Sequence, residues 1–206
     1  MASIFHLAGS LALAVLFVPT APDQAPRVGQ PAPQFTATDS NGQSRSLAQY
    51  RGQYVVLEWH NRDCPYTHKQ YVSGNTQDLQ HEWTEKGVAW FTVISSAPGK
   101  QGYVTDAQEN EYLKRMHADP TAVLMDPTGK LGRLYDARTT PEMYVISPEG
   151  KLIYEGAIDN RPTPDLSAIK GADNYVDDAL TEAMSHKRIA VPYTRPYGCS
   201  VKYANE

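Results

Sequence analysis

The stretch Tyr54-Val-Val-Leu-Glu-Trp-His-Asn-Arg-Asp-Cys-Pro-Tyr-Thr-His68 decides the fold, because an apolar run ends in a polar turn and a Cys-Pro pair opens an amphipathic segment. This order predicts a strand, a turn and a helix, with Pro65 at the first helical position, where its missing N–H costs nothing. Cys64 is then the N-cap residue, and its sulfur faces unpaired amides that favour negative charge. Because the thiolate is the nucleophilic form of cysteine, Cys64 is the first candidate for chemistry.

Length, composition and charge limit the number of domains and the class of partner. The chain has 206 residues, 41% of them hydrophobic, and a formal net charge of −4. This length suits one full-sized domain. No long basic run is present, so we expect no nucleic-acid partner. Cys64 and Cys199 are the two cysteines of the chain.

The first 21 residues have the pattern of a secretory signal peptide. Residues 8–17 are apolar but too short to span a bilayer, and Val18-Pro-Thr-Ala21 follows them as a cleavage region. The segment before them carries no Lys or Arg, so an uncleaved N-terminal anchor and a misplaced start codon are the alternatives. We expect an exported protein, periplasmic or extracellular, that touches a membrane only through an uncleaved signal segment. In such a compartment a disulfide can persist.

The remainder of the chain alternates between predicted strands and helices, which favours an α/β sheet with helices on both faces. A tail rich in Pro, Tyr and Gly follows and is expected to wrap over the domain. The expected elements are a hairpin at 35–47, a helical turn at 46–52, strands at 54–60, 88–94 and 121–126, helices at 65–86, 106–116, 130–135 and 173–187, and a hairpin at 142–156.

Three motifs carry a family resemblance: the opening Val28-Gly-Gln-Pro-Ala-Pro-Gln-Phe35, the Cys64 turn, and Thr139-Thr-Pro141 before a strand. Over residues 28–161 the chain resembles the redoxin branch of the thioredoxin superfamily, which holds peroxiredoxins and periplasmic thiol-disulfide oxidoreductases. The resemblance implies a thioredoxin-like fold with an N-terminal β-hairpin extension. It further implies a redoxin domain over residues 26–188 and a C-terminal tail over 189–206 that carries Cys199.

The resemblance also assigns roles. Cys64 takes the nucleophile position of the thioredoxin Cys-x-x-Cys motif, and Thr67 replaces the resolving cysteine. Thr139-Thr-Pro141 resembles the cis-proline loop that packs against the active cysteine, so Pro141 is expected to be cis. The alternative is an ordinary trans proline that opens an edge strand.

The enzyme class follows from the same comparison. Peroxiredoxins carry Thr or Ser three residues before their peroxidatic cysteine, whereas Asn61 holds that position here, and Leu57 stands where they carry a proline. A thiol-disulfide oxidoreductase with antioxidant function, acting on protein or small-molecule disulfides and thiols without a cofactor, is therefore expected. A peroxiredoxin-like thiol peroxidase is the alternative.

Glu58 lies inside the predicted core strand, where an acid is costly unless it is hydrogen-bonded or used in catalysis. Thioredoxins carry a buried acid at the matching position, where it moves protons for the cysteines. The resemblance thus implies an acid/base role for Glu58. The alternative is an acid at the sheet end, paired with Arg62, Lys69 or solvent.

Cys199 is a candidate partner for Cys64. It could resolve an intermediate on Cys64 or form a lasting bridge to it, since an exported chain with two cysteines seldom leaves both free. The alternative is an unpaired thiol in a flexible tail.

His60, Cys64 and His68 raise a metal alternative. Cys64 and His68 share a helix face if both are helical, and a thiolate with imidazole suits copper(I) or zinc. Copper-binding redoxins of the Sco type use two cysteines in this motif, whereas the present chain has one. A metal-binding module without turnover is therefore the less favoured interpretation, and solvated histidines are the simpler one.

Overall fold

The computed structural model describes residues 25–204. The predicted signal peptide, residues 1–21, lies outside the described residues. Between residues 25 and 204, no helix combines the length and the apolar character needed to cross a membrane.

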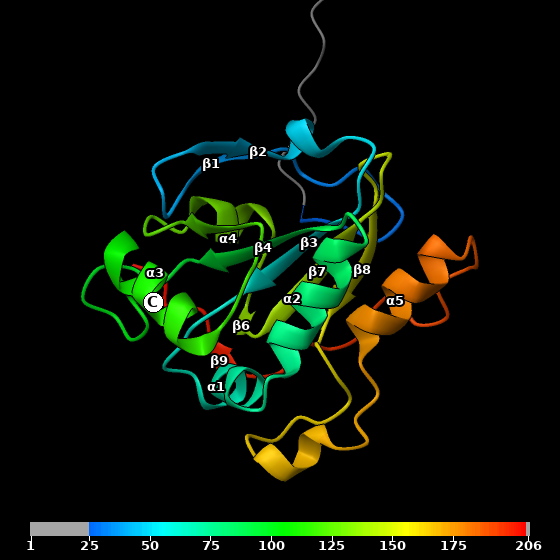
Figure 1. Cartoon of the computed structure of the whole chain (residues 1–206). Helices are drawn as coiled ribbons and strands as arrows, with labels where there is room; N and C mark the ends of the chain where they lie inside the picture. The colour runs from blue at the N-terminus through cyan, green and yellow to red at the C-terminus, as the bar shows by residue number, and fades with distance from the viewer. Residues whose placement is uncertain (1–24, 205–206) are drawn as a thin grey trace, which may run out of the picture.

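A seven-stranded mixed sheet forms the centre of the domain (Figure 1), and a separate two-stranded ladder lies next to the start of α1. The strand order is β2-β1-β5-β4-β3-β7-β8, in which β3, β4 and β5 run parallel and the outer pairs are antiparallel. The strands are β1 (Thr36–Asp39), β2 (Ser44–Ser46), β3 (Val55–Trp59), β4 (Ala89–Ile94), β5 (Ala122–Met125), β7 (Glu142–Ile146) and β8 (Leu152–Gly156), with β6 (Thr139–Thr140) and β9 (Cys199–Ser200) in the small ladder.

Helices cover both faces of the large sheet, which confirms the predicted thioredoxin-like α/β arrangement. One face packs against α2 and α5 through Leu79, Trp83 and Leu180, and the other packs against α4 and η1 through Leu131 and Leu47. The helices are η1 (Leu47–Tyr50), α1 (Pro65–Val72), α2 (Asn75–Glu85), α3 (Asp106–Met116), α4 (Lys130–Leu134), η2 (Leu166–Ile169) and α5 (Tyr175–Met184).

The single helix predicted over residues 65–86 is wrong. The structure divides it into α1 and α2 at Gly74, whose φ of 82° lies in the left-handed region that glycine adopts without steric cost. The Ser73 hydroxyl donates to the Gln70 carbonyl (3.1 Å) and so helps to end α1. As a result α1, whose N-cap is Cys64, is a short helix that is separate from α2.

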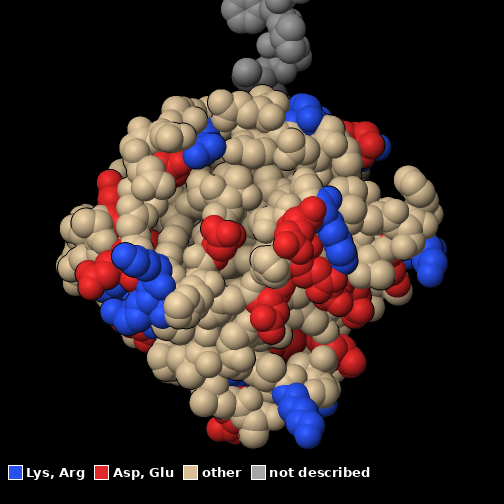
Figure 2. All heavy atoms as spheres, viewed as in Figure 1, with Lys and Arg blue, Asp and Glu red and all other residues tan. Residues whose placement is uncertain are grey.

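The surface charge is uneven. Figure 2 shows acidic side chains gathered over α2 and α5 on the face in view. These helices bring Glu82 close enough to Asp177 to contribute to its raised pKa, after burial, which is the larger cause. An acidic face of this kind suits neither nucleic acid nor an anionic lipid surface.

The C-terminal tail wraps over the domain, as expected, and β9 pairs with β6 so that Cys199 lies opposite Thr140. The approach is close: a Cβ atom built on Gly198 would lie 2.0 Å from the Thr140 carbonyl oxygen, and the φ of Gly198 is 137°. Beyond Cys199, the Val201 amide donates to the Arg138 carbonyl (2.9 Å), and the Tyr203 hydroxyl donates to the Ala137 carbonyl (2.8 Å). The tail is therefore part of the packed structure.

Candidate redox site

Cys64 occupies the predicted N-cap of α1, with Pro65 at the first helical position. Its side chain is completely buried. The Cys64 amide donates to the Asn61 carbonyl (3.0 Å), which closes the turn after β3, and the thiol donates to the Thr140 carbonyl (3.0 Å). The fold therefore places this sulfur at the junction of β3, α1 and the Thr140 loop.

The Thr140–Pro141 peptide bond is cis, as predicted. Its loop brings the Thr140 carbonyl against the sulfur of Cys64, while the Thr140 hydroxyl is buried without a hydrogen-bond partner among the described residues. Two of the three motifs that carry the resemblance, the Cys64 turn and the Thr-Pro loop, are therefore in contact at the Cys64 sulfur.

Cys199 lies at the same point. Its thiol and its backbone amide both interact with the sulfur of Cys64, and both residues are present as thiols. Cys64 is buried, whereas Cys199 is partly exposed. The tail thus brings the two cysteines of the chain into contact, although about 135 residues separate them.

The surroundings lower the pKa of one thiol and raise the pKa of the other. Burial raises the pKa of Cys64, but hydrogen bonds from the Cys199 thiol, the Thr67 amide and the Cys199 amide outweigh it, so that the pKa falls below its ordinary value. Burial and the neighbouring Cys64 raise the pKa of Cys199 to about 12. The arrangement favours one thiolate, on Cys64, that accepts a hydrogen bond from the thiol of Cys199.

Thr67 holds the position that a resolving cysteine takes in thioredoxins. Its side chain is buried, and its hydroxyl has no hydrogen-bond partner among the described residues. Its contribution to the site is the backbone amide, which lowers the pKa of Cys64 as the first turn of a helix is expected to do.

Glu58 is buried in β3, and its expected alternative pairing with Arg62, Lys69 or solvent is wrong. The Glu58 carboxylate instead accepts from the Trp90 indole (2.9 Å) and the Gln80 amide (3.4 Å). Lys69 lies 3.7 Å from Asp159. None of the contacts described for Glu58 includes Cys64.

The metal-ligating alternative is not supported by the positions of its three residues. His60 is buried, with Nδ1 3.8 Å from Glu58 and Nε2 4.0 Å from Glu109, whereas His68 is exposed. Within residues 25–204, no group of three or more His, Cys, Asp or Glu side chains has an arrangement that could hold a metal ion.

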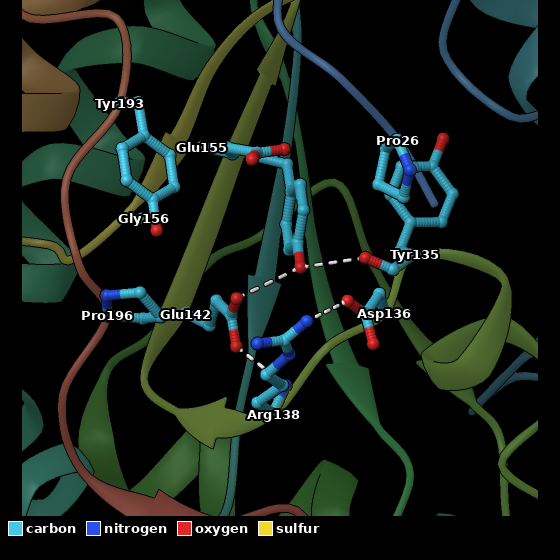
Figure 3. Close-up of a pocket in the computed structure, with 10 residues that line it drawn as sticks. Pro26, Tyr135, Asp136, Arg138, Glu142, Glu155, Gly156, Tyr193 and Pro196 are labelled. Atoms are coloured by element: carbon cyan, nitrogen blue, oxygen red, sulfur yellow. Dashed lines mark hydrogen bonds and ion pairs between the residues drawn. The ribbon is translucent and has the colours of Figure 1, made fainter. Parts of the chain in front are cut away.

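Glu142 is a supporting residue that the sequence reasoning missed. Its carboxylate accepts from the amides of Arg138 (2.7 Å) and Thr139 (2.9 Å) and from the Tyr144 hydroxyl (3.1 Å), as Figure 3 shows in part. Burial raises the pKa of this carboxyl. By fixing the amides that precede Thr140, Glu142 holds the loop that contacts Cys64. The available signal was an acid placed directly after Pro141 in an otherwise apolar strand.

Comparison with known proteins agrees with this geometry. The model of the AhpC/TSA family matches residues 28–155. Thiol-disulfide oxidoreductase ResA of Bacillus thuringiensis is 26% identical over 129 residues, which cover 62% of this chain and 68% of ResA.

Two solved structures show the same fold. The hypothetical protein SMc02350 from Sinorhizobium meliloti superposes with a TM-score of 0.76 at 18% identity, covering 89% of this chain and 98% of that one. The putative thiol:disulfide interchange protein DsbE from Chlorobium tepidum gives 0.51 at 21% identity, covering 64% and 85%. Because the family match spans more than half of the sequence and the fold agrees with it, this chain belongs to the AhpC/TSA family, within the redoxins of the thioredoxin superfamily.

Proposed function

We propose that this protein is a thiol-disulfide oxidoreductase whose redox centre is the pair Cys64 and Cys199. The observation that carries the proposal is the contact between the two sulfurs beside Thr140, with the thiolate favoured on Cys64. Forming a disulfide between them removes two electrons and two protons, which an incoming disulfide accepts as it becomes two thiols.

The surrounding residues have separate parts in this proposal. The Thr67 amide stabilises the Cys64 thiolate, and the loop of Thr140 and Pro141 fixes the position of the sulfur. Cys199 supplies the second thiol, which Thr67 cannot provide.

Glu58 is the acid/base candidate of the proposed site. A Glu58→Gln variant can still accept from Trp90 and Gln80 but cannot ionise, so it should change the pH profile of exchange while the protein stays folded. A profile that matches the parent protein at every pH would limit Glu58 to a structural part.

A peroxidase function is less well supported. The Asn61 side chain oxygen accepts from the Asp63 amide (2.9 Å), so it stabilises the turn before Cys64. Asparagine has no hydroxyl, so the Thr or Ser hydroxyl that peroxiredoxins have at this position is missing here. We therefore place disulfide exchange ahead of peroxide reduction.

We also propose that the protein is exported and that residues 1–21 are removed as a signal peptide. The apolar run and the Ala21 region support this, together with a cysteine pair suited to an oxidising compartment. Fractionation of the source cells and sequencing of the mature N-terminus would test it, and a mature chain that begins at Met1 in the cytosol would contradict it.

The activity is tested by measuring reduction of insulin or glutathione disulfide side by side with consumption of hydrogen peroxide. Disulfide activity should be lost in Cys64→Ser, strongly reduced in Cys199→Ser and retained in Ser200→Ala, which alters an exposed neighbour. A fast peroxide reaction that depends on Cys64, with negligible disulfide exchange, would reverse the order of the two functions.

A further inference from the structure

The two sulfurs of the proposed pair differ in access. Cys64 is completely buried, whereas Cys199 is partly exposed. The tail is anchored on both sides of Cys199: the Tyr197 hydroxyl donates to Asp159 (2.6 Å), and the buried Tyr203 bonds to the Ala137 carbonyl (2.8 Å). Because the anchored tail places the partly exposed Cys199 against the buried Cys64, a molecule that arrives from solvent meets Cys199 before Cys64.

A hollow of about 610 Å³ opens beside Cys199. Its walls include Thr139 and Gly198, which lie next to the Thr140–Cys199 pair of the β6–β9 ladder. Tyr175 and Tyr197 provide aromatic surface in the same hollow. The volume falls in the range of sites that bind small molecules.

The hollow is lined by one carboxylate and one arginine: Asp159 is buried and lies 3.7 Å from the Lys69 ammonium, whereas the arginine faces solvent. Arg195 lines the hollow, is exposed and forms no ion pair within the described part of the chain. On the other side of Cys199, the Lys202 ammonium acts on the Cys199 thiol through its charge. A cation in the hollow, Arg195, and a cation that acts on the Cys199 sulfur, Lys202, favour an incoming thiol that carries negative charge.

Resting on the proposed function, we propose that small anionic thiols attack the bridged form of this protein at Cys199, from the hollow lined by Arg195, and that Cys64 is the leaving sulfur. In the step that opens the bridge, the thiolate RS⁻ attacks the sulfur of Cys199. The bond between R–S and Cys199 forms, the Cys64–Cys199 bond breaks, and its electron pair leaves on Cys64 as thiolate. A second thiol attacks the R sulfur and releases RSSR, so that two RSH are oxidised and two cysteine thiols are formed.

The direction of attack agrees with the leaving group. In thiol-disulfide exchange the sulfur with the lower pKa leaves faster, and access decides which sulfur is attacked. Cys64 is the sulfur whose thiolate the site stabilises, through the Thr67 amide, and Cys199 is the accessible one. Both criteria therefore assign the attack to Cys199.

The test starts from protein oxidised to the Cys64–Cys199 bridge and uses glutathione as the anionic thiol. After brief reaction and acid quenching, peptide mass spectrometry should find glutathione on Cys199 and Cys64 as a free thiol. Glutathione predominantly on Cys64 would overturn this inference alone. Failure to form the bridge before glutathione is added would overturn the proposed function as well, so the two failures are distinguishable.

A charge variant tests the hollow. Arg195→Gln should slow reduction by glutathione about two- to fivefold, the range of an exposed charge interaction, and should leave reduction by the neutral thiol β-mercaptoethanol unchanged. Arg188→Gln, which alters an exposed arginine just before the tail, should change neither rate. Equal rates with glutathione in the parent and Arg195→Gln proteins, or equal slowing with both thiols, would contradict binding at this hollow.

Discussion

Cys64 and Cys199 lie in contact, yet their surroundings lower the pKa of Cys64 and raise the pKa of Cys199. The Cys64 sulfur accepts hydrogen bonds from the Cys199 thiol and from amides, whereas Cys199 has Cys64 itself as its main polar neighbour. A thiolate next to a thiol suits disulfide exchange. One sulfur is already in the nucleophilic form, and the second lies close enough to complete an internal disulfide once a mixed disulfide has formed.

The first prediction concerns the pKa of Cys64. The parent protein should develop thiolate absorbance below the ordinary thiol pKa of about 8.5, and the exchange rate should rise with pH only until Cys64 is ionised. Cys199→Ala removes a hydrogen bond that lowers the pKa of Cys64, so the transition should move to higher pH. In Cys64→Ala, the pKa of Cys199 should fall from about 12, since the neighbouring negative charge is gone. A Cys64 titration that is identical in the parent and Cys199→Ala proteins would contradict this account.

The second prediction concerns Glu142. Replacing it with Ala leaves the Arg138 and Thr139 amides without their acceptor, at a cost of about 1–3 kcal/mol for each buried group that finds no new partner. Urea unfolding should show the loss, and exchange through Cys64 should slow because the Thr140 loop is no longer fixed. Glu149→Ala, at an exposed position in the turn before β8, is the control and should leave the exchange rate unchanged. Parent-like stability and exchange in Glu142→Ala would remove its positioning role.

Local sequence predicted part of the site. The N-cap position of Cys64 follows from the adjacent Pro65, and the cis Pro141 follows from the resemblance of Thr139-Thr-Pro141 to the cis-proline loop of the redoxins. The partners of Glu58 and the role of Glu142 depend on side chains from other strands and helices, so no local pattern could reveal them.

At the scale of elements, the short β6–β9 ladder joins the tail to the loop that contacts Cys64. It has only two residue pairs, Thr139 with Ser200 and Thr140 with Cys199. Gly198 permits this approach because no side chain fits between it and the Thr140 carbonyl.

The third prediction is that Gly198→Ala displaces the tail. The new Cβ would collide with the Thr140 carbonyl oxygen, so the ladder should open and Cys64 should react faster with iodoacetamide in the reduced protein. Gly171→Ala is a matched control, since Gly171 also has a positive φ, 74°, but has nothing within 4 Å of an added Cβ. If Gly198→Ala and Gly171→Ala label Cys64 at the same rate, the ladder does not cover the site.

The elements also show where periodicity succeeds and fails. Hydrophobic pattern predicted the strands of the large sheet and most helices, since each buries a continuous face. The same pattern predicted one helix in place of α1 and α2, because the side-chain pattern continues across Ser73 and Gly74 although the backbone turns there. A ladder of two-residue strands has no periodicity of its own, so β6 and β9 become visible only in the folded chain.

At the scale of the whole molecule, Cys64 and Cys199 join two parts of the chain that are distant in sequence. A bridge from Cys64 to Cys199 would close a loop of about 135 residues. In the chain-entropy description such a closure stabilises the folded state by about 5 kcal/mol, less any strain that the bridge introduces.

The fourth prediction follows from this closure. The oxidised protein should unfold at higher urea concentration than the reduced protein, and the difference should vanish in Cys199→Ser. Identical urea midpoints for bridged and reduced parent protein would mean that strain in the bridge cancels the gain from loop closure.

The most direct test of the redox pair is non-reducing peptide mapping of the protein equilibrated in a glutathione redox buffer. The contact between the two sulfurs beside Thr140 predicts a peptide that links Cys64 to Cys199, whose amount changes reversibly with the ratio of oxidised to reduced glutathione. If the two cysteines are instead each found with glutathione, or remain free across the whole range with no linked peptide, Cys64 and Cys199 are not a redox pair.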